Sequence, residues 1–255
     1  MKKTTLLALA FLFFAPAFCV FAEQFENPMP NLTVPSGLED GQAYIVIDHK
    51  FLRSLYDYPK DDLYAVLDGG ADFSLDFRYK IGWNIEAQVG YTTANREQTA
   101  ALSYTLDAPK MPFNSRLDVQ FFSYYDFIAD TYDQNLFYLL SLQSIPFLED
   151  RMIFTIDAGY DGFNGYIGLG LGASYEVTRH LNIVAEYYPV FRESGAVGHI
   201  GTTGCYSAGL KIDTFGHQFM FTAGNSSDIG TRRMMLGTDT QDVFIGLKIM
   251  RLIAF

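Results

Sequence analysis

The feature that most constrains this chain is an alternation of apolar and polar side chains with a period of two. Over residues 166–178, the odd positions from Ile167 to Val177 are apolar, and the even positions from Gly168 to Glu176 are glycine, serine or glutamate. A period of two places all the apolar side chains on one face of a strand, whereas a helix would spread them around its surface. The pattern therefore predicts β-strands.

The same alternation recurs along most of the chain, and turn residues such as glycine and proline separate the segments. No helical pattern interrupts the series. It predicts an all-β fold, an antiparallel transmembrane β-barrel of about 12 strands, with about 10–14 as the range because residues 66–80 and 135–145 alternate less clearly. The expected strands are residues 43–52, 66–80, 83–93, 98–107, 116–128, 135–145, 151–161, 166–178, 181–191, 205–213, 217–225 and 241–254.

The start of the chain has the layout of a secretory signal peptide. Two lysines precede an apolar run from Leu6 to Ala15, which is too short to span a bilayer, and a cleavage site follows at Ala22. A lipoprotein anchor at Cys19 is the alternative, but Phe18 before it is too bulky. We therefore expect a signal peptide over residues 1–22, a periplasmic N-terminal segment over 23–42 and an outer-membrane β-barrel over 43–255.

Beyond the leader, the chain has no run of 18 apolar residues that could form a transmembrane helix. A closed barrel crosses a bilayer with strands of about 9–11 residues that are apolar only at alternate positions. The terminal Phe255 resembles the signal that barrel-assembly machinery reads. We therefore expect a monomer in the outer membrane of a diderm bacterium, with outer-membrane lipid and the assembly machinery as partners.

A secreted soluble β-sandwich or a lipocalin-like barrel is the alternative fold, since these proteins also alternate. Two features argue against it. The polar faces are rich in glycine, and the apolar faces carry aromatic side chains at strand ends, as the interfacial girdles of membrane barrels do. These aromatic residues are Trp83, Tyr91, Tyr160, Tyr175 and Tyr187.

The charge balance limits the partners. A formal net charge of −11 and a pI near 4.7 exclude a general nucleic-acid binder. If the apolar faces meet lipid, acids outnumber bases on the inward faces, and an acidic lumen favours cations. The residues expected to line the lumen are Asp72, Asp76, Glu86, Asp118, Asp157, Glu176, Glu186, Lys211, Asp213 and Lys248.

Two functions fit this lumen. One is a narrow pore that passes small cationic or neutral solutes through an acidic interior. The other is a non-conducting structural or partner-binding barrel, in which the charges pair across strands and brace a nearly closed interior. Barrels of about 8 strands are filled by side chains and porins of about 16–18 strands are open, so a count near twelve leaves both functions open.

An outer-membrane hydrolase is a remote third alternative. None of the four histidines has a serine two positions later, and no Gly-x-Ser-x-Gly motif is present. His199 and Cys205 supply at most two metal ligands. The glycines of residues 165–172 follow a strand period with no helix after them, so they predict lumen space or a bend rather than a phosphate loop. We expect no enzymatic activity, no cofactor and no metal.

Arg232 and Arg233 make the expected outer loop 226–240 locally basic, a charge that suits lipopolysaccharide phosphates. The loop is too short for a separate adhesin domain.

Several short segments resemble a known family. Residues 43–51 resemble an early strand with a His-Arg-Phe motif, with Lys50 in place of the arginine, and residues 67–75 resemble the stretch after it. Residues 216–225 resemble a late strand, and residues 246–251 resemble the last one. Together they are similar to a family of exported bacterial membrane-bound β-barrel proteins of unknown function, best known from Bacteroidetes-type genomes. The resemblance implies a membrane-bound barrel and supplies no catalytic or binding residues.

Overall fold

The computed structural model describes residues 28–56, 70–106, 111–127, 129–191 and 200–255. The expected signal peptide, residues 23–27, His199 and most of the expected outer loop 53–65 lie outside the described residues.

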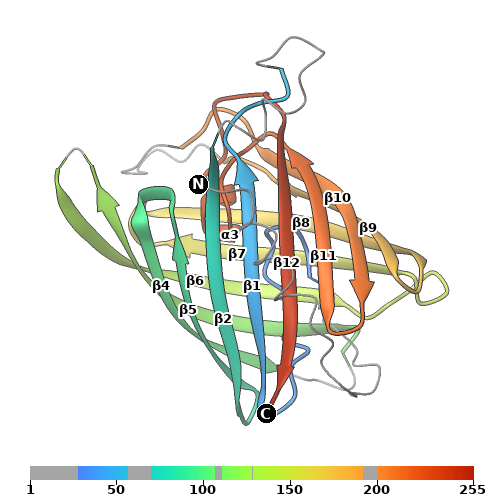
Figure 1. The fold of residues 1–255 in the computed structure, drawn as a ribbon. Helices are drawn as coiled ribbons and strands as arrows, with labels where there is room; N and C mark the ends of the chain where they lie inside the picture. Colours follow the sequence, from blue (N-terminus) through green and yellow to red (C-terminus); the bar gives the residue numbers. More distant parts are fainter. Residues whose placement is uncertain (1–27, 57–69, 107–110, 128, 192–199) are drawn as a thin grey trace, which may run out of the picture.

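The described chain forms one closed antiparallel barrel, in which every strand pairs with its neighbours in sequence and β1 pairs with β12 (Figure 1). This confirms the predicted all-β fold and the count of twelve. The strands are β1 Gln42–Phe51, β2 Ala71–Gly82, β3 Ile85–Thr92, β4 Glu97–Leu106, β5 Phe113–Asp126, β6 Thr131–Ser144, β7 Met152–Asp161, β8 Tyr166–Thr178, β9 Leu181–Tyr188, β10 Cys205–Thr214, β11 His217–Gly224 and β12 Phe244–Ala254.

The barrel closes between its two terminal strands. Gln42 is paired with Ala254 and Lys50 with Gly246, so β1 and β12 run side by side along their whole length. Closure pairs the backbone groups that would otherwise form an open edge, which is the condition for a sheet to cross a bilayer.

The outer surface of the barrel is apolar. On β8 the residues Ile167, Leu171 and Tyr175 are exposed, whereas the glycines between them are buried. On β7 the same rule exposes Phe154 and Ile156. The prediction that the apolar face of each strand points outward is therefore confirmed for these strands. A bilayer would cover this face.

One predicted girdle residue belongs to a turn instead. Trp83 and Asn84 join β2 to β3, and both have positive φ angles, 52° and 62°. Two consecutive positive φ angles are what a tight hairpin turn requires, so the strand begins at Ile85 rather than at Trp83. The other four aromatic residues, Tyr91, Tyr160, Tyr175 and Tyr187, are exposed on strands.

The two ends of the barrel differ in the length of their connections. Residues 83–84, 179–180 and 215–216 are two-residue turns at the end that also carries the C-terminus, at the bottom of Figure 1. At the opposite end the links 52–70, 189–204 and 225–243 are much longer. Short periplasmic turns and long outer loops are the usual asymmetry of outer-membrane barrels, which makes the end with the C-terminus the periplasmic one.

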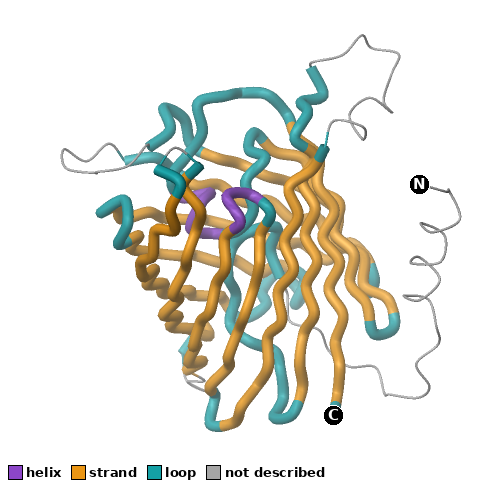
Figure 2. The backbone as a smooth tube through the Cα atoms, turned by 60° about the vertical axis from the view of Figure 1, so that its left-hand side comes forward, coloured by secondary structure: helices purple, strands orange, loops and turns teal. Residues whose placement is uncertain are grey.

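Two segments lie inside the barrel, as Figure 2 shows. One is the short helix α3 (Thr231–Met235) in the outer loop 225–243. The other is residues 28–38, called the plug below, which precede β1. We expected residues 23–42 to lie in the periplasm. Residues 28–38 lie in the lumen instead, because they are bonded to inward-facing side chains of six strands.

An apolar cluster fills part of the interior. Met29, Leu32 and Val34 of the plug pack with Met234 and Met235 of α3. The wall supplies the remaining members, Phe122, Phe137, Leu139, Val184, Tyr188, Cys205 and Met220. A core therefore forms inside the barrel, and this explains why β6 alternates less clearly: its inward Phe137 and Leu139 belong to this core.

Candidate functional site in the barrel lumen

The plug is held at its upper part by Glu186 of β9. The backbone N–H groups of Asn31 and Leu32 donate to Glu186 Oε2 at 2.8 and 3.1 Å, and the Asn31 side-chain amide donates to Glu186 Oε1. The Glu186 side chain is 4% exposed. One buried carboxylate thus accepts three hydrogen bonds from two consecutive plug residues, which replaces the water that a carboxylate otherwise requires.

The middle of the plug is held by β6 and β7. The backbone N–H of Thr33 donates to Asp157 Oδ2 at 2.8 Å, and the Ser141 hydroxyl donates to the Thr33 carbonyl at 2.7 Å. The backbone N–H and the carbonyl of Thr33 are therefore both hydrogen-bonded to side chains of the wall. The plug remains outside the β-ladder and depends on these side chains.

The lower part of the plug meets a charged cluster. The Ser36 hydroxyl donates to Glu86 Oε2 at 2.6 Å. Glu86 also forms ion pairs with Arg78 at 2.8 Å and Arg116 at 2.9 Å, and Arg116 forms another with Asp118 at 2.7 Å. Pairing across β2, β3 and β5 offsets these charges, and the buried network braces the wall.

A stripe of glycines on β8 makes room for the plug. A Cβ atom at Gly170 or Gly172 would collide with Leu32, and one at Gly172 would also collide with Met29. A Cβ at Gly168 would collide with Met235 of α3. The prediction that these glycines leave lumen space is confirmed by these close approaches, since any larger residue would displace the segments inside the barrel.

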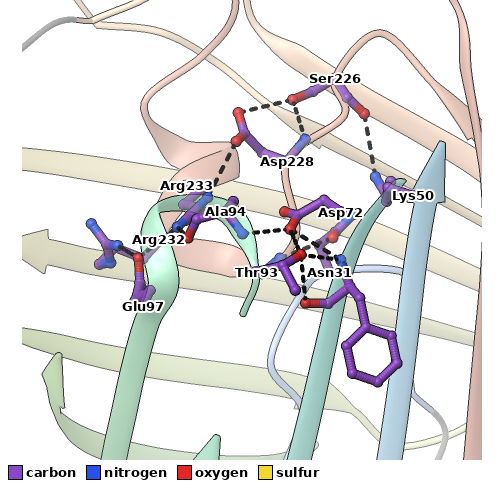
Figure 3. A network of polar contacts seen from close by, with 12 residues as sticks. Asn31, Lys50, Asp72, Thr93, Ala94, Glu97, Ser226, Asp228, Arg232 and Arg233 are labelled. Atoms are coloured by element: carbon purple, nitrogen blue, oxygen red, sulfur yellow. Dashed lines mark hydrogen bonds and ion pairs between the residues drawn. The ribbon is translucent and has the colours of Figure 1, made fainter. Parts of the chain in front are cut away.

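The outer loop folds inward and is tied to the wall by two arginines (Figure 3). Arg232 pairs with Glu97 of β4 at 2.6 Å and with Asp161 of β7 at 3.2 Å. Arg233 pairs with Glu97 at 2.8 Å. Burial by itself lowers the pKa of Arg233, but the Glu97 carboxylate outweighs this effect and the pKa is raised. Both guanidiniums point into the lumen, so they do not form the exposed basic patch that the sequence suggested.

A second set of contacts fixes the same loop to the other side of the barrel. The Lys50 ammonium donates to the Ser226 carbonyl at 3.4 Å (Figure 3). Thr231 of α3 donates through its hydroxyl to the Asn31 carbonyl at 2.6 Å, and its Oγ1 lies 3.1 Å from Thr33 Oγ1. The loop and the plug therefore hold each other in place.

A polar cavity of about 180 Å³ remains between these segments and the wall. Its lining includes Asp76, Gln88, Asp118 and Gln120, together with parts of the plug and α3. Asp76 is bonded by two uncharged donors, the Ser74 hydroxyl at 2.6 Å and the Gln88 amide at 3.1 Å. Acids and bases both line the cavity, so it suits a small polar molecule better than an apolar one.

The sequence-predicted lumen residues divide into three groups. Glu86, Asp157 and Glu186 contact the plug, and Lys248 reaches both Asp48 at 3.1 Å and the carbonyl of Pro30. Asp76 and Asp118 line the cavity, whereas Asp72 accepts from Thr93 at 2.7 Å near the outer rim. The last group lies away from the plug: Glu176, Lys211 and Asp213, of which Asp213 is bonded by Asn182 and Gln218. That they line an open path stays a prediction.

Sequence reasoning missed the plug itself, and with it the partners of the acids. The signal was present in residues 28–38, where Met29, Leu32, Val34 and Leu38 are apolar without a strand period. Such a segment beside glycine-rich inward faces indicates filling of the lumen. Periodicity alone cannot find it, because a segment without regular structure has no period.

The histidines His49 and His217 lie apart from one another on the strands. No group of three or more possible metal ligands occurs among the described residues. His49 packs against Phe51 and Phe73 on the outer face of β1, and His217 lies 2.5 Å from Arg251 near the periplasmic end. Within the described part of the chain, no helix is long and apolar enough to cross a membrane.

Comparison with known families and structures agrees with this architecture. Residues 138–252 match the family model described as "Membrane bound beta barrel domain (DUF5777)", and this stretch includes residues 216–225 and 246–251, two of the segments that carry the resemblance. No curated protein matches the chain by sequence.

Three solved structures are similar in fold. The NanC porin has a TM-score of 0.50 and 7% identity, over 83% of this chain and 99% of its own. Omp33 of Acinetobacter baumannii has a TM-score of 0.48 and 9% identity, over 85% and 99%. The COG4313 outer membrane channel of Pseudomonas putida F1 has a TM-score of 0.46 and 11% identity, over 90% and 100%. At 7% identity the likeness to the NanC porin shows the fold alone.

The membrane follows from these findings taken together. The family model that matches residues 138–252 describes a membrane-bound barrel, the barrel of this chain is closed, and its strands expose large apolar side chains with aromatic residues at their ends. Closed barrels of this kind belong to bacterial outer membranes. The chain is therefore an outer-membrane β-barrel with a porin-like fold.

Proposed function

We propose that this outer-membrane barrel is a narrow channel for small neutral or cationic solutes, with its path along the polar side of the lumen. The observation that carries the proposal is the cavity of about 180 Å³ beside β1 to β5. Charged and amide side chains of β2 to β5 form much of its wall, and apolar residues of the plug and of β6, such as Leu32 and Leu139, complete the lining. A hydrated solute needs a polar wall, so only this side can pass it.

The charges near the cavity favour neutral and cationic solutes over anions. The arginines are engaged with acids, as Arg116 is with Glu86 and Asp118. Asp76 is instead hydrogen-bonded by uncharged donors, and Lys248 of the same cavity offsets its negative charge in part. In a low-dielectric channel one such carboxylate raises the local concentration of cations.

Ion selectivity of the refolded protein in planar bilayers tests the proposal. With a salt gradient, we expect small steps and a reversal potential that favours cations. Asp76→Asn should move the reversal potential toward zero, because it removes the carboxylate from the path. Asp213→Asn is the matched control, since Asp213 is also bonded by uncharged donors but lies outside the cavity.

A non-conducting scaffold is the second candidate, and the filled lumen favours it. Plug, α3 and wall share one apolar cluster, and many of the lumen acids have a bonded partner. A protein that is silent in bilayers, yet folded by its heat-modifiable mobility on a gel, would support this function and contradict the channel. If the protein conducts and Asp76→Asn leaves the reversal potential unchanged, the solute path does not run through this cavity.

A further inference from the structure

We infer that the lumen wall contains a binding site for a peptide segment with a bend in its backbone and that the plug is its removable occupant. The site consists of the carboxylates of Glu186 and Asp157 and the glycine stripe of β8. The inference deepens the proposed function, since it names what closes the path, but the binding measured below does not depend on conduction.

The two carboxylates are complementary to a peptide backbone. They accept from three consecutive backbone N–H groups, those of Asn31, Leu32 and Thr33. Among the described residues, no lysine, arginine or histidine lies within ion-pair distance of either carboxylate. Unoccupied, the site would hold two buried acids without these donors, a costly arrangement. The wall is therefore built to receive N–H groups.

The glycine stripe makes the site complementary in shape to the side chains of the plug. The Leu32 side chain occupies the space where Gly170 and Gly172 lack a Cβ, and the Met29 side chain lies against Gly172. The preceding Asn31 places its amide on Glu186. The ligand class is thus a segment that bends where an amide side chain is followed by a medium-sized aliphatic one.

The occupant is removable because the barrel closes without it. β1 and β12 pair directly, so the plug contributes no strand to the ring. Each hydrogen bond described above between the plug and the strands involves a side chain, and these bonds and the apolar contacts have to break for the plug to leave. Below the plug, Leu38 packs with Tyr44, Val46, Met250 and Leu252 near the periplasmic end, which anchors the base of the segment while its upper part moves.

Peptide binding tests this inference directly. A chain refolded from Glu39 onward lacks the plug, and we expect it to bind a fluorescein-labelled synthetic peptide of residues 28–38 in anisotropy measurements. The intact chain should not bind it, because its own plug occupies the site at high effective concentration. Glu186→Gln in the shortened chain should weaken binding about tenfold, because it replaces charge-assisted acceptors by a neutral amide.

Glu176→Gln is the matched control, since Glu176 is an inward carboxylate of β8 that bonds to no plug residue in the described chain. It should leave binding unchanged. A folded shortened chain that does not bind the peptide overturns the inference. If the shortened chain binds the peptide but no variant conducts ions, the inferred peptide site stands. The proposed channel is then overturned.

A second measurement uses the full chain, in case the shortened one does not fold. In a Cys205→Ala background, Val34→Cys places a thiol at a buried position of the plug, 3% exposed, that a membrane-impermeant maleimide reaches only when the plug leaves its site. Glu186→Gln should raise the labelling rate about tenfold and Glu176→Gln should not. A labelling rate that is the same in all three chains overturns the inference.

Discussion

The two sides of the lumen use their inward faces in opposite ways. On the side of β6 to β11 the wall presents Phe137, Leu139, Val184 and Met220, and these side chains enclose apolar residues of the plug and α3. On the side of β2 to β5 the wall presents charged side chains that pair with one another across strands and border the cavity. One side is a dry core and the other a charged surface.

The acids of the two sides differ accordingly. Glu86 on the charged side is satisfied chiefly by two arginines of the wall, whereas Glu186 on the dry side is satisfied chiefly by donors of the plug, with a longer bond of 3.4 Å from the Tyr188 hydroxyl. The first acid is bound to the permanent structure and the second to a separable segment. An acidic residue in a barrel lumen can thus brace the wall or hold an occupant, and only its partner tells which.

The largest expected loss of stability comes from a variant that breaks the ion pairs of the charged side. Arg116 is 1% exposed and pairs with Glu86 and Asp118, so Arg116→Ala leaves two neighbouring carboxylates without their shared cation. We expect a loss of about 3–5 kcal/mol in the free energy of unfolding. Urea unfolding in lipid vesicles, followed by circular dichroism, measures it.

The control for that variant is Arg151→Ala, which removes an exposed arginine from a periplasmic turn. It should change stability by less than about 0.5 kcal/mol. Equal losses in the two variants would contradict the view that the buried pairs brace the wall.

A smaller effect is expected on the dry side. Leu32→Ala removes a buried side chain, 4% exposed, and leaves a cavity between the plug and β8, at a cost of about 2–3 kcal/mol. Gly172→Ala adds a methyl group where Leu32 lies, so in the Leu32→Ala chain it should restore part of the loss. Urea unfolding of the two single variants and the double variant gives the coupling.

Gly168→Ala in the Leu32→Ala chain is the matched control, because its methyl group would meet Met235 rather than Leu32. It should restore nothing. Additive losses for Leu32 and Gly172 would show that the plug does not lie in the glycine stripe.

The smallest effect concerns the cavity. Gln88→Ala removes the amide that donates to Asp76 at 3.1 Å, and we expect a loss of about 1 kcal/mol in unfolding free energy. Gln120→Ala also removes an amide from the cavity lining, but no hydrogen bond of that amide is present within the described residues, so its effect should be close to zero. A Gln88 effect as large as that of Leu32 would mean that the cavity is packed like the dry side.

Much of the fold could be predicted because its signal is local. The phase of β8, from Ile167 to Val177, is readable from neighbouring residues, and the structure exposes the predicted face. The main errors occur where local pattern has no information, as at Trp83, which continues the alternation but occupies a turn with positive φ. For the site, the inward position of Glu186 and Asp157 was predictable but their partners were not.

By itself, therefore, the sequence determined the closed apolar exterior, because lipid contact depends on a period of two that each strand carries alone. Only the tertiary structure decided what fills the interior. Asn31 meets Glu186 across 155 positions and Thr231 across 200, and Arg232 reaches Glu97 across 135. Contacts at such separations depend on how the closed ring brings distant strands, plug and loop together, and no local pattern encodes that.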